Sequence, residues 1–136
     1  MVELAEIMTA DVFTVAPDSP VAEAAAAMAK GRFGSAVVMQ GQVLVGIFTE
    51  RDVLRAAASG NDLTRSPVSR WMTRDPETVG PHVDSERAAE IMLGSGFRHL
   101  PVVAGTALVG IVSLRDLLSL RVRRHPSSQA RLAPHV

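Results

Sequence analysis

Two short stretches carry the residues of this chain whose types and spacing could do chemistry. Each places a hydroxyl residue, one variable residue, an arginine and an aspartate in a row: TERD at 49–52 and SLRD at 113–116. At a helix start, backbone N–H groups beside a hydroxyl and a guanidinium can hold phosphate oxygens. A carboxylate there can accept the hydroxyls of a ribose, as acids do in dinucleotide folds. The apolar residues just before each stretch could contact a base.

The same residues also suit a plain helix cap. A threonine or serine at the N-cap, followed by an acid three residues later, is the pattern of a capping box, which satisfies free N–H groups at the helix start. Thr49 with Asp52 fits this pattern, and so does Ser113 with Asp116. From local physics both interpretations stay open.

The two stretches belong to a long internal repeat. Residues 7–54 align with 71–118 at a fixed shift of 64 without a gap, and nineteen of the 48 positions are identical. A match of this length predicts two copies of one structural unit. We therefore expect one repeat over residues 1–62, a second over 63–120, and a basic tail over 121–136 that is poorly ordered.

Each unit has the pattern β-α-β-β-α. A short strand (13–15 or 77–79) precedes a helix, and two β-rich runs follow (36–39 and 43–48; 100–103 and 107–112). Gly41 and Gly105 mark the tight turns between these runs, and a second helix begins at Thr49 or Ser113. The sequence predicts an α+β fold with three-stranded sheets packed on helices.

Composition excludes several classes of function. The 136 residues include no cysteine, so no disulfide, thiolate nucleophile or Cys-type zinc site can form. The histidines outside the second repeat's FRHLPVV run (His82, His125, His135) lack metal-ligand spacing, so we expect no metal. No apolar run approaches the roughly 20 residues that span a bilayer. The start of the chain lacks a basic signal region, which favours a cytoplasmic protein.

The order and duplication of these motifs resemble a tandem pair of cystathionine β-synthase (CBS) domains over residues 2–120. The matching text is IMT and WMT, TVAPDSPVAEAAAAM and TVGPHVDSERAAEIM, FGSAVVM and FRHLPVV, and GIFTERD and GIVSLRD. The resemblance implies two units of a CBS fold related by a pseudo-twofold axis. It also implies adenosine ligands, such as AMP, ADP, ATP or S-adenosylmethionine, in clefts between the units, and a homodimer.

Carried over residue by residue, the resemblance implies two composite sites. In each, the hydroxyl, arginine and aspartate hold phosphate and ribose, and the base lies between the isoleucine of the same copy and residues of the other copy. The first site would comprise Thr49, Arg51, Asp52 and Ile47, with Val79, Val83 and Ala88. The second would comprise Ser113, Arg115, Asp116 and Ile111, with Val15, Ser19 and Ala24.

Arg98 and His99 distinguish the two copies, because the aligned positions in the first copy are Gly34 and Ser35. In the related gamma subunit of AMP-activated kinase, basic residues here reach toward phosphates. The resemblance thus implies that Arg98 and His99 serve the Asp52 site and make it the more favourable one for phosphate. The alternative is that both are partly solvated residues at a strand end.

The preferred function is a regulatory module that binds an adenosine nucleotide or derivative without catalysis and signals to a separate effector protein. The alternative is a structural dimerisation module with vestigial pockets. We expect no enzyme, because neither a nucleophile–base pair nor a metal cluster is evident. Nucleic-acid binding would rest on the basic tail alone, since the chain has no basic face with interleaved aromatic residues.

Overall fold

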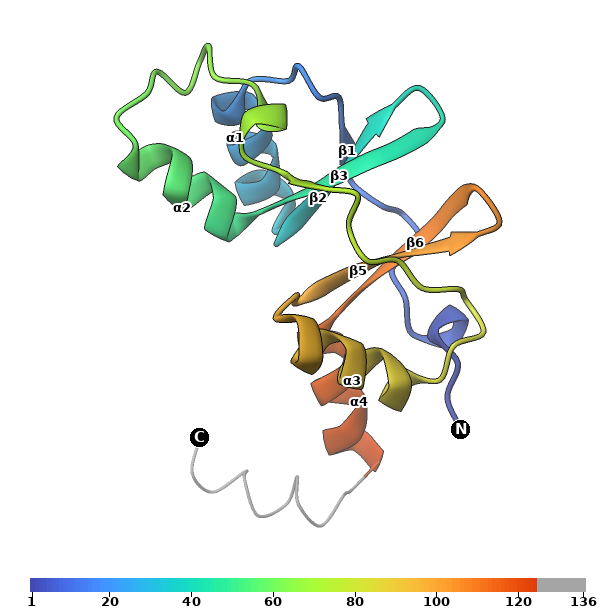
Figure 1. Ribbon diagram of the computed structural model, residues 1–136. Coiled ribbons are helices and arrows are strands. Elements are labelled where there is room, and N and C mark those ends of the chain that lie inside the picture. The colour runs from blue at the N-terminus through green and yellow to red at the C-terminus, as the bar shows by residue number, and fades with distance from the viewer. Residues whose placement is uncertain (125–136) are drawn as a thin grey trace, which may run out of the picture.

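Two units of similar construction make up the protein. The computed structural model describes residues 1–124, and Figure 1 shows strands at the centre of the molecule with the helices of each unit toward its outer ends. The first unit contains β1 (Thr14–Val15), α1 (Val21–Gly31), β2 (Ser35–Gln40), β3 (Val43–Thr49) and α2 (Glu50–Ala58). The second contains α3 (Ser85–Ser95), β5 (His99–Ala104), β6 (Ala107–Ser113) and α4 (Leu114–Arg124).

The expected β-α-β-β-α pattern is confirmed. β2 pairs antiparallel with β3, and β5 pairs in the same way with β6. Gly41 and Gly105 take the positive φ angles of 63° and 62° that the tight turns require. β1 runs parallel to β2, whereas its counterpart in the second unit is a single parallel bridge between Val79 and Val102. Each repeat therefore supplies three strand segments to its own sheet.

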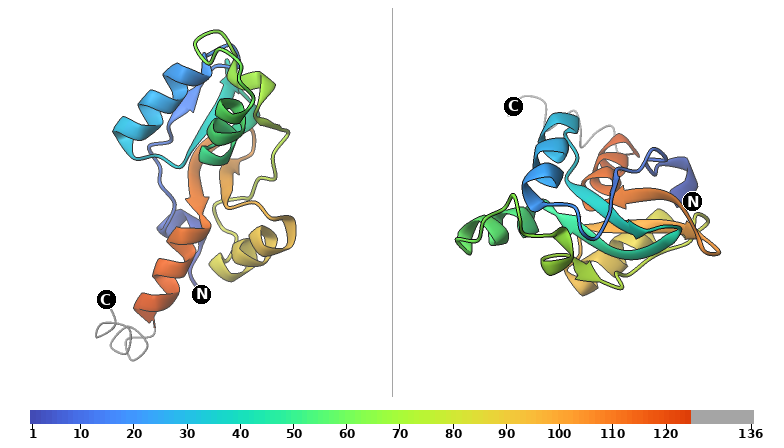
Figure 2. Two further views of the ribbon diagram at one scale, coloured as in Figure 1. Left: turned by 90° about the vertical axis from the view of Figure 1, so that its left-hand side faces the viewer. Right: turned by 90° about the horizontal axis from the view of Figure 1, so that it is seen from above.

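The segment that leads into each repeat packs on the other repeat. The short 3-10 helix Leu4–Glu6 lies beside the second unit, and Leu4 is fully buried in that unit's core (Figures 1 and 2). The 3-10 helix Val68–Arg70 lies on the first unit in the same way, and Val68 is fully buried there. The two lead-in segments are thus exchanged between the units.

The exchange extends to the sheets. β4 (Thr73–Arg74) pairs antiparallel with β3, and Thr9 forms the equivalent antiparallel bridge to Ile111. This adds an edge segment to each sheet beyond the three predicted strands. The predicted boundary between residues 62 and 63 separates the two repeats in the sequence. In the structure, Val68 and β4, which follow this boundary, belong to the core and the sheet of the first unit.

α4 continues through Arg124, and so includes the first residues of the tail expected to be poorly ordered. Residues 125–136 of that predicted tail lie outside the described residues. Among residues 1–124, no helix combines the length and the apolar character needed to cross a membrane.

Candidate functional site

Both predicted capping boxes are formed. At the start of α2, the Thr49 N–H donates to Asp52 Oδ2 at 2.9 Å and the Asp52 N–H donates to Thr49 Oγ1 at 3.4 Å. At the start of α4, the Ser113 N–H donates to Asp116 Oδ2 at 3.2 Å and the Asp116 N–H donates to Ser113 Oγ at 3.1 Å. Both aspartates therefore stabilise their own helix, whatever else they bind.

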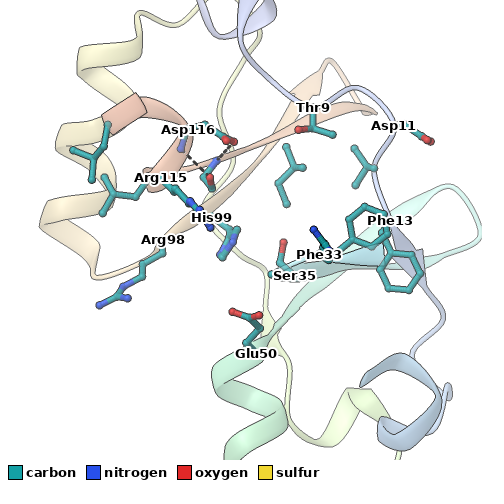
Figure 3. A pocket seen from close by; sticks show the side chains of 17 residues that line it. Thr9, Asp11, Phe13, Phe33, Ser35, Glu50, Arg98, His99, Arg115 and Asp116 are labelled. Atoms are coloured by element: carbon teal, nitrogen blue, oxygen red, sulfur yellow. Dashed lines mark hydrogen bonds between the residues drawn. The ribbon is translucent and has the colours of Figure 1, made fainter. Parts of the chain in front are cut away.

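Two clefts open at these helix starts. The Asp52 cleft has a volume of about 530 Å³ and the Asp116 cleft about 670 Å³. Both volumes lie within the roughly 300–1,000 Å³ that is typical of small-molecule sites. Residues of both repeats line each cleft, so each is a site between the units. Figure 3 shows the Asp116 cleft, with Asp116, Arg115 and His99 at one end and Phe13 and Phe33 at the other.

Most of the predicted site residues line these clefts. The Asp52 cleft includes the six predicted residues Ile47, Thr49, Arg51, Asp52, Arg98 and His99. The Asp116 cleft includes the four predicted residues Ile111, Ser113, Arg115 and Asp116. The structure thus brings together the residues expected to contact phosphate and ribose in each site.

The six residues of the opposite repeat that were expected to receive the base line neither of these clefts. Ala24 and Ala88 are 2% and 0% exposed, and each lies in the core of its own unit. Val79 also lies in the core of the second unit. Val15 and Val83 are half-buried and pack against the cores of their own units. The Ser19 hydroxyl accepts the Ala16 N–H at 3.1 Å in a turn. The apolar faces of α1 and α3 cover their own sheets, and the assignment of these six residues to the base stays a prediction.

The lead-in segments contribute to the clefts instead. Residues Thr9, Asp11, Val12 and Phe13 of the first lead-in line the Asp116 cleft, and Thr73 of the second lines the Asp52 cleft. Phe13 stacks on Phe33, with ring centroids 5.2 Å apart and planes inclined by 8° (Figure 3). The repeated text MTAD and MTRD at 8–11 and 72–75 was the available signal for these positions.

The two aspartates differ in their remaining capacity for hydrogen bonds. Asp52 Oδ2 accepts both the N–H and the hydroxyl of Thr49, and its Oδ1 accepts Arg55 Nη1 at 2.9 Å. Asp116 accepts the Ser113 N–H. A carboxylate has about four acceptor positions, so both can accept ribose hydroxyls, and in the described contacts Asp116 keeps more of its positions open.

Arg98 and His99 line both clefts, together with Gly34 and Glu50. Arg98 and His99 thus lie at the Asp116 cleft as well as at the Asp52 cleft, to which the resemblance assigned them. Burial lowers the pKa of His99 below its ordinary value of about 6.5. The charge of Arg98 acts in the same direction, whereas the carboxylates of Glu50 and Asp116 oppose it.

This pKa shift predicts a pH dependence of stability. The folded state binds a proton at His99 less readily than the unfolded state does, so the stabilising contribution is full above pH 6.5 and is lost as the pH falls through the folded pKa. We expect the urea midpoint of the wild type to fall more between pH 7.5 and pH 5 than that of His99→Gln. Equal falls in both proteins would contradict the assignment to His99.

Comparison with known proteins identifies relatives across the chain. The model of the CBS domain family matches residues 4–59 and again residues 68–123. An uncharacterized 17.7 kDa protein of Acidianus ambivalens is 44% identical over 117 residues, which cover 85% of this chain and 70% of that protein. The CBS domain-containing protein YhcV of Bacillus subtilis is 37% identical over 118 residues, or 86% of this chain and 84% of that protein.

Solved structures with the same fold include ligand complexes. A putative signal-transduction protein with CBS domains from Burkholderia ambifaria superposes with a TM-score of 0.86 at 27% identity, over 91% of this chain and 96% of that one. The CBS domain pair of MJ0100, crystallised with 5′-methylthioadenosine and S-adenosylmethionine, has a TM-score of 0.84 at 23% identity, over 91% and 98%. CBSX2, crystallised with AMP, has a TM-score of 0.77 at 22% identity, over 91% and 98%.

Proposed function

This chain belongs to the CBS domain family, with two domains in tandem, and on that premise we propose that it is a regulatory module that binds adenosine nucleotides or derivatives between its repeats. The observation that carries the proposal is the pair of clefts. Each gathers a helix start, a hydroxyl, an arginine and an aspartate from one repeat beside residues of the other. Two proteins of the same fold bind AMP or S-adenosylmethionine with 5′-methylthioadenosine, which is the ligand class proposed here.

The mechanism is binding without a chemical step. A ligand that contacts both repeats favours one arrangement of the pair, in proportion to its difference in affinity for the alternatives. The protein then presents a changed surface to an effector protein. A homodimer fits this role. Leu54 and Leu118 occupy equivalent positions in the two repeats, and their side chains are 69% and 51% exposed. These apolar side chains could be covered by a second copy of the chain. The molar mass of the purified chain in light scattering tests the dimer.

The charges of the clefts support a preference for phosphate at the Asp52 cleft. Its lining includes three arginines against two acids, and the lining of the Asp116 cleft includes three of each. The arginines of the Asp52 cleft are Arg51, Arg55 and Arg98. One of them, Arg55, already pairs with Asp52 at 2.9 Å. The positive charge that remains available to a phosphate is therefore that of Arg51 and Arg98.

A structural module with vestigial pockets is the second candidate, and one observation favours it. Asp52 accepts the Thr49 N–H and Asp116 accepts the Ser113 N–H, so each aspartate has a structural role in its capping box that is sufficient to hold it in place. Under this alternative, the clefts bind no adenosine compound.

Thermal unfolding against AMP, ADP, ATP, S-adenosylmethionine, NADH and GTP separates the two candidates. A ligand at 100 times its dissociation constant adds about 2.7 kcal/mol, which raises the Tm by roughly 5–15 °C for a chain of this size. We expect such a shift with at least one adenosine compound and none with GTP. An unchanged Tm across the whole panel would reject the sensor function and favour the structural module.

A further inference from the structure

A methionine of each lead-in lies directly against a glycine of a strand. A Cβ atom added to Gly110 of β6 would lie 2.5 Å from Met8 Sδ and 2.8 Å from Met8 Cγ. A Cβ atom added to Gly46 of β3 would lie 2.6 Å from Met72 Sδ. Real Cβ atoms do not approach other atoms this closely. Each thioether therefore fills the space that a side chain on the glycine would occupy.

Met8 lies between the two contacts that hold the first lead-in on the second unit. Leu4, which is fully buried, accepts the Met8 N–H at 2.8 Å through its carbonyl. Thr9 follows directly, and it and Ile111 each donate an N–H to the carbonyl of the other at 2.9 Å. The Met8 side chain packs against the second core. A change in this side chain therefore acts on both contacts.

Exposure distinguishes Met8 from its counterpart in the second lead-in. Met8 is half-buried, whereas Met72 is 9% exposed and belongs to the first core. Met28 and Met92, in the two cores, are 3% and 1% exposed. A small oxidant in solution reaches a half-buried thioether more readily than a buried one. Of the two methionines that lie against glycines, Met8 is thus the one open to oxidation.

We propose that Met8 is a site of reversible oxidation by peroxides, and that its sulfoxide releases the first lead-in from the second unit. A sulfur lone pair attacks one oxygen of hydrogen peroxide, and the O–O bond breaks. The transferred oxygen gives its proton to the departing hydroxide, which leaves as water. The sulfur loses two electrons and the peroxide gains them. Methionine sulfoxide reductases restore the thioether.

Two effects of the added oxygen make the sulfoxide incompatible with the closed position. The thioether already contacts the Gly110 backbone, so further volume there overpacks the site. The oxygen is also a polar acceptor, and placing it against an apolar core is unfavourable without a donor. Because Thr9 and Ile111 both line the Asp116 cleft, release of the lead-in also opens that cleft. The second lead-in, with Met72 buried, stays in place.

Amide hydrogen exchange of the full chain, followed by NMR before and after treatment with hydrogen peroxide, tests the proposal. The reporters are the Leu4 N–H, which donates to the Val83 carbonyl at 3.0 Å, and the Thr9 N–H. The matched reference is the Val68 N–H, which makes the equivalent bond to the Ser19 carbonyl at 2.9 Å. We expect exchange at both reporters to accelerate at least about tenfold, with the reference unchanged.

Mass spectrometry of the same samples locates the sulfoxides. We expect the sulfoxide of Met8 to form before that of Met72. A protein that carries Met8 sulfoxide and keeps both reporters protected would overturn the proposal. So would a Met8 that stays reduced while Met1, which is 96% exposed, is oxidised. Equal acceleration at Val68 would also overturn it, because the loss would then be general unfolding.

Three variants assign the effect to one sulfur. Met8→Leu keeps an apolar side chain of similar size and should hold exchange at the reporters within about twofold after peroxide. Met8→Gln, which carries a polar oxygen, should lose their protection without peroxide. Met39→Leu, at a half-buried position on β2, is the control and should respond as the wild type does. An oxidised Met8→Leu protein that lost protection like the wild type would show that another methionine is responsible.

Reduction of the oxidised wild type decides the matter without any variant. Methionine sulfoxide reductases should return Met8 to the thioether and restore the protection of Leu4 and Thr9. A chain whose Met8 is reduced again, but whose reporters stay unprotected, would overturn the proposed reversibility. None of these measurements requires a nucleotide, so their outcome is independent of the proposed function.

Discussion

Shortening Leu4 to alanine is expected to lower the free energy of unfolding by about 2–5 kcal/mol, the range for large-to-small changes in a core. Leu4 is fully buried among residues of the second unit, although it lies at the start of the chain. Its N–H donates to the Val83 carbonyl at 3.0 Å, which holds the segment in place. Urea denaturation of the full chain, read by circular dichroism, measures the loss.

The matched control is Leu93→Ala, which makes the same substitution on α3 of the same unit. Leu93 is 73% exposed, so we expect a change of no more than about 0.5 kcal/mol. A small effect at Leu4, comparable to that at Leu93, would mean that the first lead-in does not complete the second core.

Replacing both Asp52 and Asp116 with alanine is expected to weaken adenosine binding by at least a hundredfold. Each carboxylate would accept ribose hydroxyls through charge-assisted hydrogen bonds, which contribute about 1.5–3 kcal/mol apiece. Each single variant should leave one competent cleft, so the number of adenosine molecules bound per chain should fall from two to one. Calorimetric titration gives both the number and the affinity.

The control for this experiment must lose a helix cap without touching a cleft. Asp84 is the N-cap of α3, its side chain accepts the Glu86 N–H at 3.5 Å, and it lines neither cleft. Asp84→Ala and Asp52→Ala should each cost about 0.5–2 kcal/mol of stability, but only the second should reduce adenosine binding. Equal binding by the wild type and the doubly substituted protein would leave capping as the sole role of both aspartates.

The local pattern of the sequence was sufficient to predict the repeat unit. Hydrophobic runs, glycine turns and the hydroxyl–acid spacing each act within a few residues, and the strands, turns and capping boxes are found where these patterns placed them. The gathering of the hydroxyl, arginine and aspartate side chains at each cleft followed as well, because it depends on one helix start per repeat.

The exchange of the lead-in segments could not be predicted from such patterns. The residues of a two-residue strand do not indicate which of two similar sheets the strand joins, because β3 and β6 offer equivalent edges for pairing. One trace was nevertheless present in the repeated glycines. A Cβ atom at Gly46 would lie 2.6 Å from Met72 Sδ, and one at Gly110 would lie 2.5 Å from Met8 Sδ. The methionine of each lead-in therefore packs on the repeated glycine in a strand of the other repeat.

The residues that the resemblance assigned to the base stay a prediction. The crossed assignment took them from β1 and α1, or their counterparts, and these segments pack on the cores of their own units. The other repeat does contribute to each cleft, through Thr9–Phe13 and Thr73 in the exchanged segments. Which part of a neighbouring unit reaches a cleft depends on tertiary packing, which the spacing of motifs does not encode.

The exchanged lead-ins give the molecule the architecture of a domain-swapped dimer contained within a single polypeptide. The lead-in segment of each repeat packs on the other repeat, as in two separate subunits that exchange identical elements. Here the linker from the first half to the second has joined the partners into one chain, so their association no longer depends on concentration. Two separate chains, each made of one lead-in segment and one repeat, would have the complementary surfaces needed to form the same pair. Duplication and fusion of a single repeat that formed such a dimer would produce this topology without any new contact between the halves.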